Sequence, residues 1–343
     1  MKYEYKKLDI DSYIDSLYLE GFKKSNIHND EELKNIILNI GIFKFKGYSK
    51  AFRKEVLTES IDDILNLYYA DRSISSKLFE LSSKIEIKLK SYLIEIVYEL
   101  TENPFFYLIK ESYIEDYKIS NESIYDWEVK EVKRKQKSEI YLHYRDYYLD
   151  KYDFESNKTE YLKDKNIIQL NKELDINYPP FHYFTENITL GALINMISKL
   201  TINGNNILKL LANKFNMYDT DVFLTYLLRL KEVRNRCAHN GRLFNRNYRG
   251  VKAFGKHKSF RKTIYEHKLI DVYYSLHLLL NEKQFNDINE LNQSFKDEVF
   301  VNCDKKIEEF MIKILRTGWV CMQWPTVSNK IINEFSLKIV KKW

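Results

Sequence analysis

The chain has 343 residues, of which 44% are hydrophobic, 15% aromatic and 30% charged, and its formal net charge is +6. The 9 glycines and 4 prolines are too few for a protein with many tight turns, so an all-β sandwich or barrel is disfavoured. The 3 cysteines have no C-x-x-C spacing, which disfavours a disulfide framework and a cysteine zinc site. Without a leader sequence or an apolar run long enough to span a bilayer, we expect a soluble, cytoplasmic protein with no membrane partner.

The N-terminal part of the chain is predicted to be mainly helical. Two short helices are expected between residues 8 and 40, the second capped by Asn29 or Asp30. Residues 42–48 alternate apolar and basic side chains, which predicts a short strand or an aromatic turn. From Ile74 to Leu100, apolar residues recur every three or four positions, as in an amphipathic helix with one buried face.

Beyond this helix, polar and helical stretches alternate. Residues 110–175 are the most polar part of the chain and predict an inserted, charged helical lobe. Helical patterns follow at 188–201 and 220–239, and after a basic stretch another occurs at Leu269–Leu280. Residues 281–343 form a C-terminal extension with further apolar periodicity. The predicted fold class is therefore all-α, with additional helices at both ends.

The end of the 220–239 pattern gathers side chains that could do chemistry. One face of this helix carries, at steps of three or four residues, Glu232, Asn235, Arg236 and His239. Arg234 lies off this face, but its long side chain can turn the guanidinium toward His239. These groups suit RNA cleavage by attack of the ribose 2′-OH on the adjacent phosphorus.

Histidine is the side chain suited to act as a base near neutral pH, and a planar guanidinium matches two phosphoryl oxygens. Asn235 would orient His239 or bind the ribose. The chemistry requires no metal or cofactor, and its use of the 2′-OH selects RNA over DNA.

The spacing of arginine and histidine is not specific by itself. With 12 Arg and 7 His, roughly 0.7 pairs with four to six intervening residues are expected by chance. The chain has two, Arg234 with His239 and Arg261 with His267, and we interpret the second as structural. A histidine at a helix C-terminus is often stabilised by the helix dipole, so on spacing alone a structural role for His239 stays open.

A wider pattern surrounds the first pair. Arg234-Asn235 and Ala238-His239 are followed by Arg242, Phe244 and Asn245. Further blocks occur in order along the chain, namely Gly47-Tyr48, Asp71-Arg72, Ile85-Glu86, Phe184-Thr185-Glu186 and Leu190-Gly191. With these blocks, residues 8–280 resemble the Abi family of bacterial abortive-infection proteins of the AbiD/AbiF type. That family is part of the HEPN superfamily of helical ribonucleases, which are similar to the nuclease domains of type VI CRISPR effectors.

The resemblance implies a HEPN-type helical bundle with metal-independent endoribonuclease activity, acting as the toxin of an abortive-infection or toxin–antitoxin system against phage. Arg234, Asn235 and His239 are then the catalytic residues. Family members act as pairs of HEPN units, so we expect a homodimer with a composite site. RNA is the expected partner as substrate and, in the form of a small structured RNA, as antitoxin.

Two departures from the family pattern are visible. The family's first long helix often carries an arginine where this chain has Lys88 or Lys90. HEPN toxins silenced by a nucleotidyltransferase carry a tyrosine two residues after the histidine, and Gly241 stands there in this chain. Regulation by a nucleotidyltransferase is therefore not expected.

A basic stretch without acids, from Gly241 to Lys262, follows the motif. Its basic residues, interleaved with aromatic ones, are typical of a surface that binds phosphates and stacks bases, whereas a solvated charged loop is the plainer interpretation. The predicted RNA-binding residues are Arg242, Phe244, Arg246, Tyr248, Arg249, Lys252, Lys256, Lys258, Arg261 and Lys262.

Three charged residues, Glu86, Glu232 and Arg236, are predicted to support the site. Glu86 would hydrogen-bond Arg234 or position a water, although a salt bridge between helices is the commoner fate of such a residue. Glu232 is expected to pair with Arg234 or Arg236. Cys237 is interpreted as a small buried residue.

We predict a single domain covering residues 1–343. Within it lie an N-terminal helical segment at 1–50, the polar insertion at 110–175, the catalytic helices and basic loop at 180–280, and the C-terminal extension at 281–343. Two other functions remain open, a non-catalytic RNA-binding module in which His239 is structural and a regulatory protein that acts through protein contacts.

Overall fold

A computed structural model of the chain describes residues 9–50, 52, 60–114, 154–165, 179–261 and 266–300. These residues are mainly helical, which confirms the predicted all-α class, and they form two compact units. Of the described residues, 9–50, 52, 60–77, 240–246 and 289–300 belong to the first unit, and 78–114, 154–165, 179–239, 247–261 and 266–288 belong to the second. Among the described residues, no helix combines the length and the apolar character that crossing a membrane requires.

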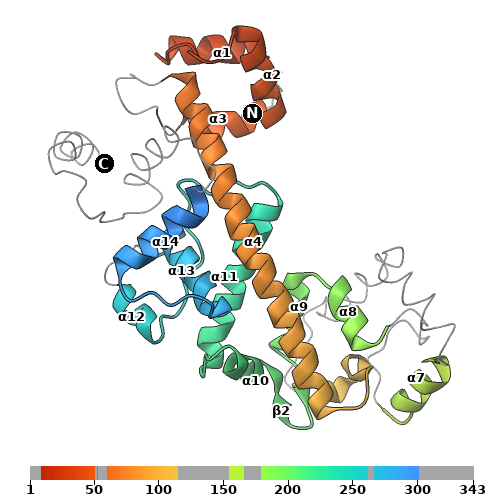
Figure 1. Cartoon of the computed structure of the whole chain (residues 1–343). Helices are drawn as coiled ribbons and strands as arrows, with labels where there is room; N and C mark the ends of the chain where they lie inside the picture. Colours follow the sequence, from red (N-terminus) through yellow and green to blue (C-terminus); the bar gives the residue numbers. More distant parts are fainter. Residues whose placement is uncertain are drawn as a thin grey trace, which may run out of the picture. The chain divides into compact units, whose positions relative to one another are not determined.

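The first unit contains three short helices near the N-terminus (Figure 1). They are α1 (Ile10–Leu19), α2 (Asp30–Ile40) and α3 (Ile42–Ser49), and α2 contacts both of the others. Asn29 caps α2 as expected, through a capping box with Glu32. The prediction for residues 42–48 was wrong, because they form α3 and not a strand or turn.

Helix α4 (Ile61–Leu100) supplies residues to both units and begins earlier than the predicted Ile74. Asp62 and Asp63 in its first turn favour this start, since acidic side chains stabilise a helix N-terminus. Helix α14 (Ile288–Phe300) lies in the predicted C-terminal extension, where helices were expected without bounds, and contributes most of its residues to the first unit.

The second unit is built around α11 (Thr220–Ala238), which contacts α9, α10 and α13. The other elements of this unit are the short 3-10 helices η1 (Phe106–Leu108) and η2 (Lys110–Ser112), α7 (Phe154–Leu162), α8 (Phe181–Asn187), α9 (Leu190–Ile197), β1 (Thr201–Ile202), β2 (Asn205–Asn206), α10 (Ile207–Lys214), α12 (Lys256–Phe260) and α13 (Leu269–Leu280). Strands β1 and β2 form a small antiparallel hairpin.

The predicted helices at 188–201, 220–239 and 269–280 correspond to α9, α11 and α13, whereas α10 and the hairpin were not predicted. Of the predicted insertion at 110–175, residues 115–153 and 166–175 lie outside the described residues. The same holds for residues 301–343 of the C-terminal extension.

Candidate functional site

Helix α11 positions the arginine–histidine motif. Its apolar face, which includes Leu230, Val233 and Cys237, is buried, as expected for Cys237. His239 is the C-cap residue, and Asn240 has the left-handed backbone (φ 52°) that commonly ends a helix. The motif therefore lies in the last turns of a helix that is fixed by the core.

Arg234 is held from two sides. Its Nε lies 3.2 Å from Oε2 of Glu86 on α4, so the two residues form an ion pair between helices, the commoner fate of such a glutamate. Its Nη1 donates a hydrogen bond of 3.3 Å to Oδ1 of Asn235. The Arg234 side chain is 31% exposed and that of Glu86 13% exposed. The guanidinium is thus oriented by neighbours but still reaches solvent.

His239 is exposed at the end of α11. Its backbone N–H bonds to the carbonyl oxygen of Asn235 at 3.0 Å, which places the two residues one turn apart. Among the described residues, no hydrogen bond or ion pair of the structure fixes the His239 imidazole. The ring can therefore turn toward a bound molecule.

Glu232 and Arg236 pair with each other and contact the basic stretch. Arg236 Nη2 lies 3.2 Å from Oε1 of Glu232, and Oε2 of the same carboxylate accepts a hydrogen bond of 2.8 Å from the backbone N–H of Arg249. The Arg236 guanidinium also lies over the ring of Tyr248, 5.6 Å from its centroid. Of the two predicted partners, Glu232 thus pairs with Arg236.

A buried charged cluster, which the sequence analysis missed, fastens the basic stretch to α11 and α13. Arg229 Nη1 lies 2.8 Å from Oδ2 of Asp271, and Oδ1 of Asp271 lies 2.8 Å from Nε2 of His257. Nδ1 of His257 contacts the Tyr226 hydroxyl, and Arg229 Nε donates to the carbonyl oxygen of Arg249. The sequence signal for this cluster is Arg229, an arginine flanked by apolar residues in a predicted helix. Its acidic partner Asp271 lies too far along the chain for a local pattern to reveal the pair.

Burial and pairing shift the pKa values in this cluster. Burial disfavours the charged form of Asp271, but the hydrogen bond from His257 and the charge of Arg229 outweigh it and hold the pKa of the carboxyl well below its usual value. Burial lowers the pKa of His257 and raises that of Tyr226. The cluster is therefore a structural ion pair with a neutral histidine.

The basic stretch divides into exposed and engaged side chains. The exposed ones are Arg246, Arg249, Lys252, Lys256 and Lys258, although Lys252 pairs with Asp221 at 3.1 Å. Arg242 donates to the carbonyl oxygen of Gly47, and Arg261 lies 3.2 Å from Glu266. Lys262 lies outside the described residues.

The predicted aromatic contacts to RNA need a correction. Phe244 is 7% exposed and Tyr248 3% exposed, because both rings pack into the core. A buried ring offers no open face, so neither ring can stack a base in this conformation.

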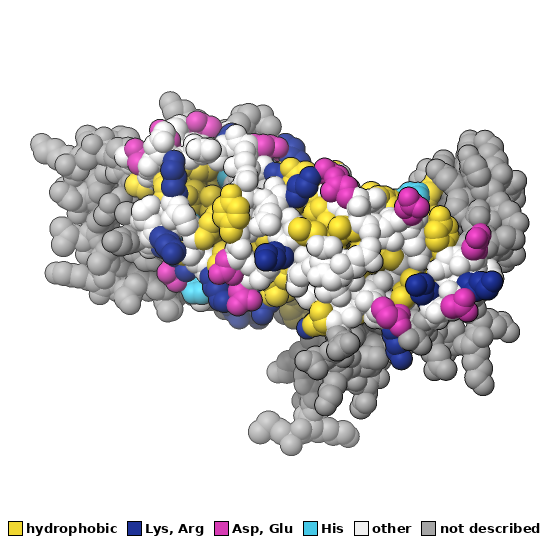
Figure 2. Space-filling model, turned by 90° about the horizontal axis from the view of Figure 1, so that it is seen from below, with side chains coloured by type: hydrophobic (Ala, Val, Ile, Leu, Met, Phe, Trp, Pro, Cys, Tyr) yellow, Lys and Arg dark blue, Asp and Glu magenta, His cyan; other side chains and the backbone are white. Residues whose placement is uncertain are grey.

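On the face shown in Figure 2, Lys and Arg side chains are interspersed with Asp and Glu, with hydrophobic side chains between them. That face has no broad field of one sign.

Asp71 organises the segment that follows His239 in the chain. Its buried carboxylate accepts hydrogen bonds from the backbone N–H groups of Leu243 and Phe244 and from the Tyr48 hydroxyl. Arg72 donates to the carbonyl oxygen of Gly241 at 2.9 Å. Residues of three blocks that are far apart in sequence thus meet within the first unit.

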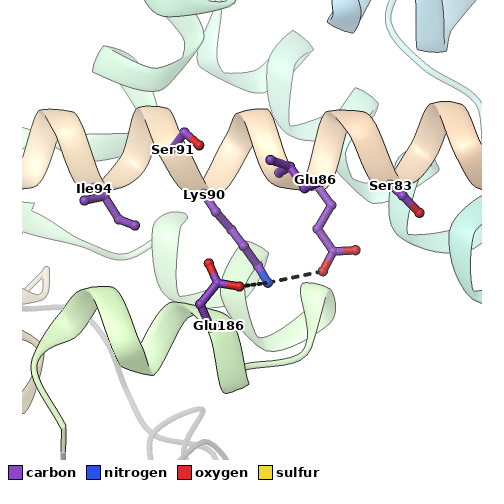
Figure 3. A pocket seen from close by; sticks show the side chains of 7 residues that line it. Ser83, Glu86, Lys90, Ser91, Ile94 and Glu186 are labelled. Carbon is purple, nitrogen blue, oxygen red and sulfur yellow. Dashed lines mark ion pairs between the residues drawn. The ribbon is translucent and has the colours of Figure 1, made fainter. Parts of the chain in front are cut away.

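A cleft of about 240 Å³ lies beside the Glu86–Arg234 ion pair, in the second unit. It is lined by Ser83, Glu86, Ile87, Lys90, Ser91 and Ile94 from α4 and by Glu186 from α8. Figure 3 shows Lys90 pointing toward both carboxylates, with Nζ 3.6 Å from Glu86 and 3.9 Å from Glu186. No local sequence pattern links Lys90 with Glu186, because the two residues lie on helices far apart in the chain.

No group of three or more His, Cys, Asp or Glu side chains that could hold a metal ion is present within the described part of the chain. The site is thus defined by Arg234, Asn235, His239 and Glu86, with the cleft around Lys90 next to them.

Comparison with known proteins identifies the family. The model of the Abi-like protein family matches residues 35–245, which is more than half of the 343 residues. No curated protein and no solved structure gives a significant match. The match includes the motif on α11 and the Gly47, Asp71 and Glu86 blocks that contact it or the segment after it. The chain therefore belongs to the Abi-like family of abortive-infection proteins.

Proposed function

We propose that this protein is a metal-independent endoribonuclease of the HEPN type, in which Arg234, Asn235 and His239 carry out the reaction. The proposal rests on the contacts and the solvent exposure of Arg234. It is oriented by Glu86 and Asn235 but remains partly exposed, with guanidinium N–H groups left to bind phosphoryl oxygens. The exposed His239 follows one turn after Asn235.

In this reaction His239 accepts the proton of the ribose 2′-OH while the 2′ oxygen attacks the adjacent phosphorus. The new P–O2′ bond forms as the bond to the 5′ oxygen breaks, and the departing oxygen takes up a proton. Arg234 stabilises the additional negative charge on the phosphoryl oxygens, which is the role of preorganised donors in a transition state. The products carry a 2′,3′-cyclic phosphate and a 5′-hydroxyl.

The proton for the departing oxygen would come from the His239 of a second copy, so the proposal includes a homodimer with a composite site. A homodimer has twice the 41.4 kDa of the single chain. Native mass spectrometry over a range of concentrations tests this part separately, and a chain that cleaves RNA while it is purely monomeric would contradict it.

The direct test is incubation of purified protein with labelled single-stranded RNA and with tRNA in excess EDTA. Replacing His239 with Ala should reduce the cleavage rate about 10²–10⁴-fold, the usual contribution of a general base. His28→Ala is the matched control, because His28 is also partly accessible but lies in the first unit beside Glu32. Equal cleavage by the His239→Ala and wild-type proteins would contradict the proposed role.

A cell that makes such a toxin must restrain it, and we extend the proposal to a small structured RNA as antitoxin. The exposed basic side chains from Arg246 to Lys258 support this, since arginine and lysine bind phosphates without a base preference. Native purification followed by sequencing of the bound nucleic acid tests it. A single RNA species that also relieves toxicity is expected, whereas protein without nucleic acid and unrelieved toxicity would refute it.

The alternative is an RNA-binding module without catalysis. Arg234→Lys separates the two, because binding tolerates a retained charge whereas a two-pronged contact to phosphoryl oxygens does not. Loss of cleavage with unchanged RNA affinity supports the enzyme. If the protein instead acts through protein contacts, neutralising the exposed basic residues will affect neither property.

A further inference from the structure

The cleft around Lys90 has no assigned role in the cleavage chemistry, yet one of its lining residues, Glu86, pairs with Arg234. We propose that it binds one guanine base of the RNA strand and thereby selects the site of cleavage. This inference rests on the proposed function and adds a base preference to it. It is carried by the shape of the cleft, the hydrogen-bonding groups at its wall and their connection to Arg234.

The volume and charge of the cleft favour a base over a phosphate. About 240 Å³ is less than the roughly 300–1,000 Å³ of pockets for drug-sized ligands, and so suits a single planar ring system. The lining carries two carboxylates, Glu86 and Glu186, and one ammonium, Lys90. Lys90 is the only cation of this lining and already faces both carboxylates, so an entering anion would find no unpaired cation, whereas a neutral base needs none. Ile87 and Ile94 add an apolar wall.

Lys90 is placed to donate hydrogen bonds to a ligand. Its side chain is 12% exposed, and its Nζ lies 3.6 Å from Glu86 and 3.9 Å from Glu186. Both separations exceed the about 2.7–2.9 Å of a charge-assisted hydrogen bond. The ammonium is therefore attracted by both carboxylates without being bonded closely to either.

The pair formed by Glu186 and Lys90 matches guanine better than the other bases. An ionised carboxylate only accepts hydrogen bonds and an ammonium only donates them. The Watson–Crick edge of guanine presents two neighbouring donors, N1–H and N2–H, beside the acceptor O6. Glu186, half exposed, can accept both donors while Lys90 donates to O6. Adenine, cytosine and uracil each offer such a carboxylate only one donor.

Glu86 connects the cleft to the catalytic arginine. Its Oε1 faces Lys90 and its Oε2 faces Arg234 at 3.2 Å, so one carboxylate separates the base-binding ammonium from the phosphate-binding guanidinium. A nucleotide likewise carries its base and its phosphate on two sides of one ribose. A guanosine whose base enters the cleft therefore brings an adjacent phosphodiester toward Arg234.

The first experiment uses the unaltered protein, so it does not depend on the folding of a variant. Otherwise identical short RNAs carry guanosine, inosine or 7-deazaguanosine at one position in a uridine background. Inosine lacks the N2 amino group, whereas 7-deazaguanosine keeps the whole Watson–Crick edge. We expect cleavage at inosine to be about tenfold slower than at guanosine, the usual effect of losing a hydrogen bond to a charged group, and 7-deazaguanosine to behave as guanosine. Equal rates at guanosine and inosine would overturn the proposal.

The second experiment alters the cleft. Glu186→Gln replaces one accepting oxygen with a donating amide and should reduce the preference for guanosine over inosine to near one. Glu95→Gln is the matched control, because Glu95 is also on the surface, is 47% exposed and pairs with Lys214 at 2.6 Å. Glu95→Gln should leave the guanosine preference unchanged, and a preference that survives Glu186→Gln would overturn the proposal.

The experiments give different results if the cleft does not select guanine and if the protein is not a ribonuclease. Cleavage that ignores the base at every position rejects the cleft and leaves the ribonuclease in place. If the protein cleaves none of the RNAs, the ribonuclease proposal fails, and the cleft is then judged from equilibrium binding of the guanosine and inosine RNAs. Tighter binding of the guanosine RNA, lost in Glu186→Gln, would still support the cleft, and equal affinities would reject it.

Discussion

Replacing Asp71 with Ala should loosen the segment that follows His239 in the chain. The Asp71 carboxylate is fully buried and accepts hydrogen bonds from the Tyr48 hydroxyl at 2.6 Å and from the backbone N–H groups of Leu243 and Phe244 at 3.1 and 2.8 Å. In the Ala variant these three donors lose their acceptor, and Arg72 loses an ion pair of 2.9 Å.

The free-energy cost of Asp71→Ala depends on the groups that lose their partner. A buried donor without a partner costs about 1–3 kcal/mol, and removing one member of a buried charge pair costs about 3–5 kcal/mol. These contributions overlap, because one rearrangement of the segment relieves several of them. We therefore expect a local loss of about 3–5 kcal/mol for Asp71→Ala. Asp71→Asn should cost less, since its amide keeps one oxygen to accept from the backbone.

Amide hydrogen exchange measures this loss locally, which matters because a chain of two units need not unfold in one step. A loss of 3 kcal/mol corresponds to exchange about a hundredfold faster, so the amides of Leu243 and Phe244 should speed up at least that much. Asp63→Ala is the matched control, as Asp63 lies on the same helix and accepts from the nearby Ser60 N–H at 2.8 Å. If Asp71→Ala leaves both amides exchanging at the wild-type rate, the anchoring role is wrong.

Three further predictions concern stability, measured by urea unfolding. The folded state should lose stability in two steps as the pH falls, because folding lowers the pKa values of His257 and Asp271. The first step begins below about 6.5, where the His257 imidazole of the unfolded chain binds a proton, and the second begins below about 3.8, where the Asp271 carboxyl does so. A urea midpoint that stays constant from pH 7 to 5 would contradict the first step. Lys88→Met should cost about 1–2 kcal/mol, because Lys88 donates to the last carbonyl groups of α13, whereas Lys88→Arg should cost less since it keeps the donors. Gly250→Ala should cost about 1–3 kcal/mol, because its new Cβ would lie 2.7 Å from Cε1 of the His267 ring.

Residues 42–48 show where local pattern fails to predict structure. Their alternation of apolar and basic side chains has the period of a strand, but they form α3. Phe45 and Tyr48 lie three residues apart, both with no exposed surface, as only a helix would place them on one buried side. Phe45 packs edge-on against Tyr13, and Tyr48 bonds to Asp71. Packing against distant residues decides the conformation, and that information is not local.

Some features of the candidate site could be predicted from the sequence, and others could not. The end of α11 at His239 follows from the helical period and the Asn240-Gly241 stop, both local signals. The pairing of Glu86 with Arg234 joins residues far apart in sequence, and it was expected only because the family resemblance drew attention to Glu86. No feature of the sequence indicated that Glu186 lies near Lys90, because single charges on two helices do not reveal which helices pack together.

The three arginines of α11 show why residue type and spacing cannot identify a catalytic group. Arg229 has 1% of its side chain exposed and is paired with Asp271 and with the carbonyl oxygen of Arg249, so it is enclosed within the fold. Arg236 is paired with Glu232 and covers the ring of Tyr248. Arg234 is the most exposed of the three and is oriented without being enclosed. A catalytic guanidinium must be fixed before substrate arrives and still have donors to offer. On α11 that combination belongs to Arg234, and it depends on which residues other helices bring to each arginine.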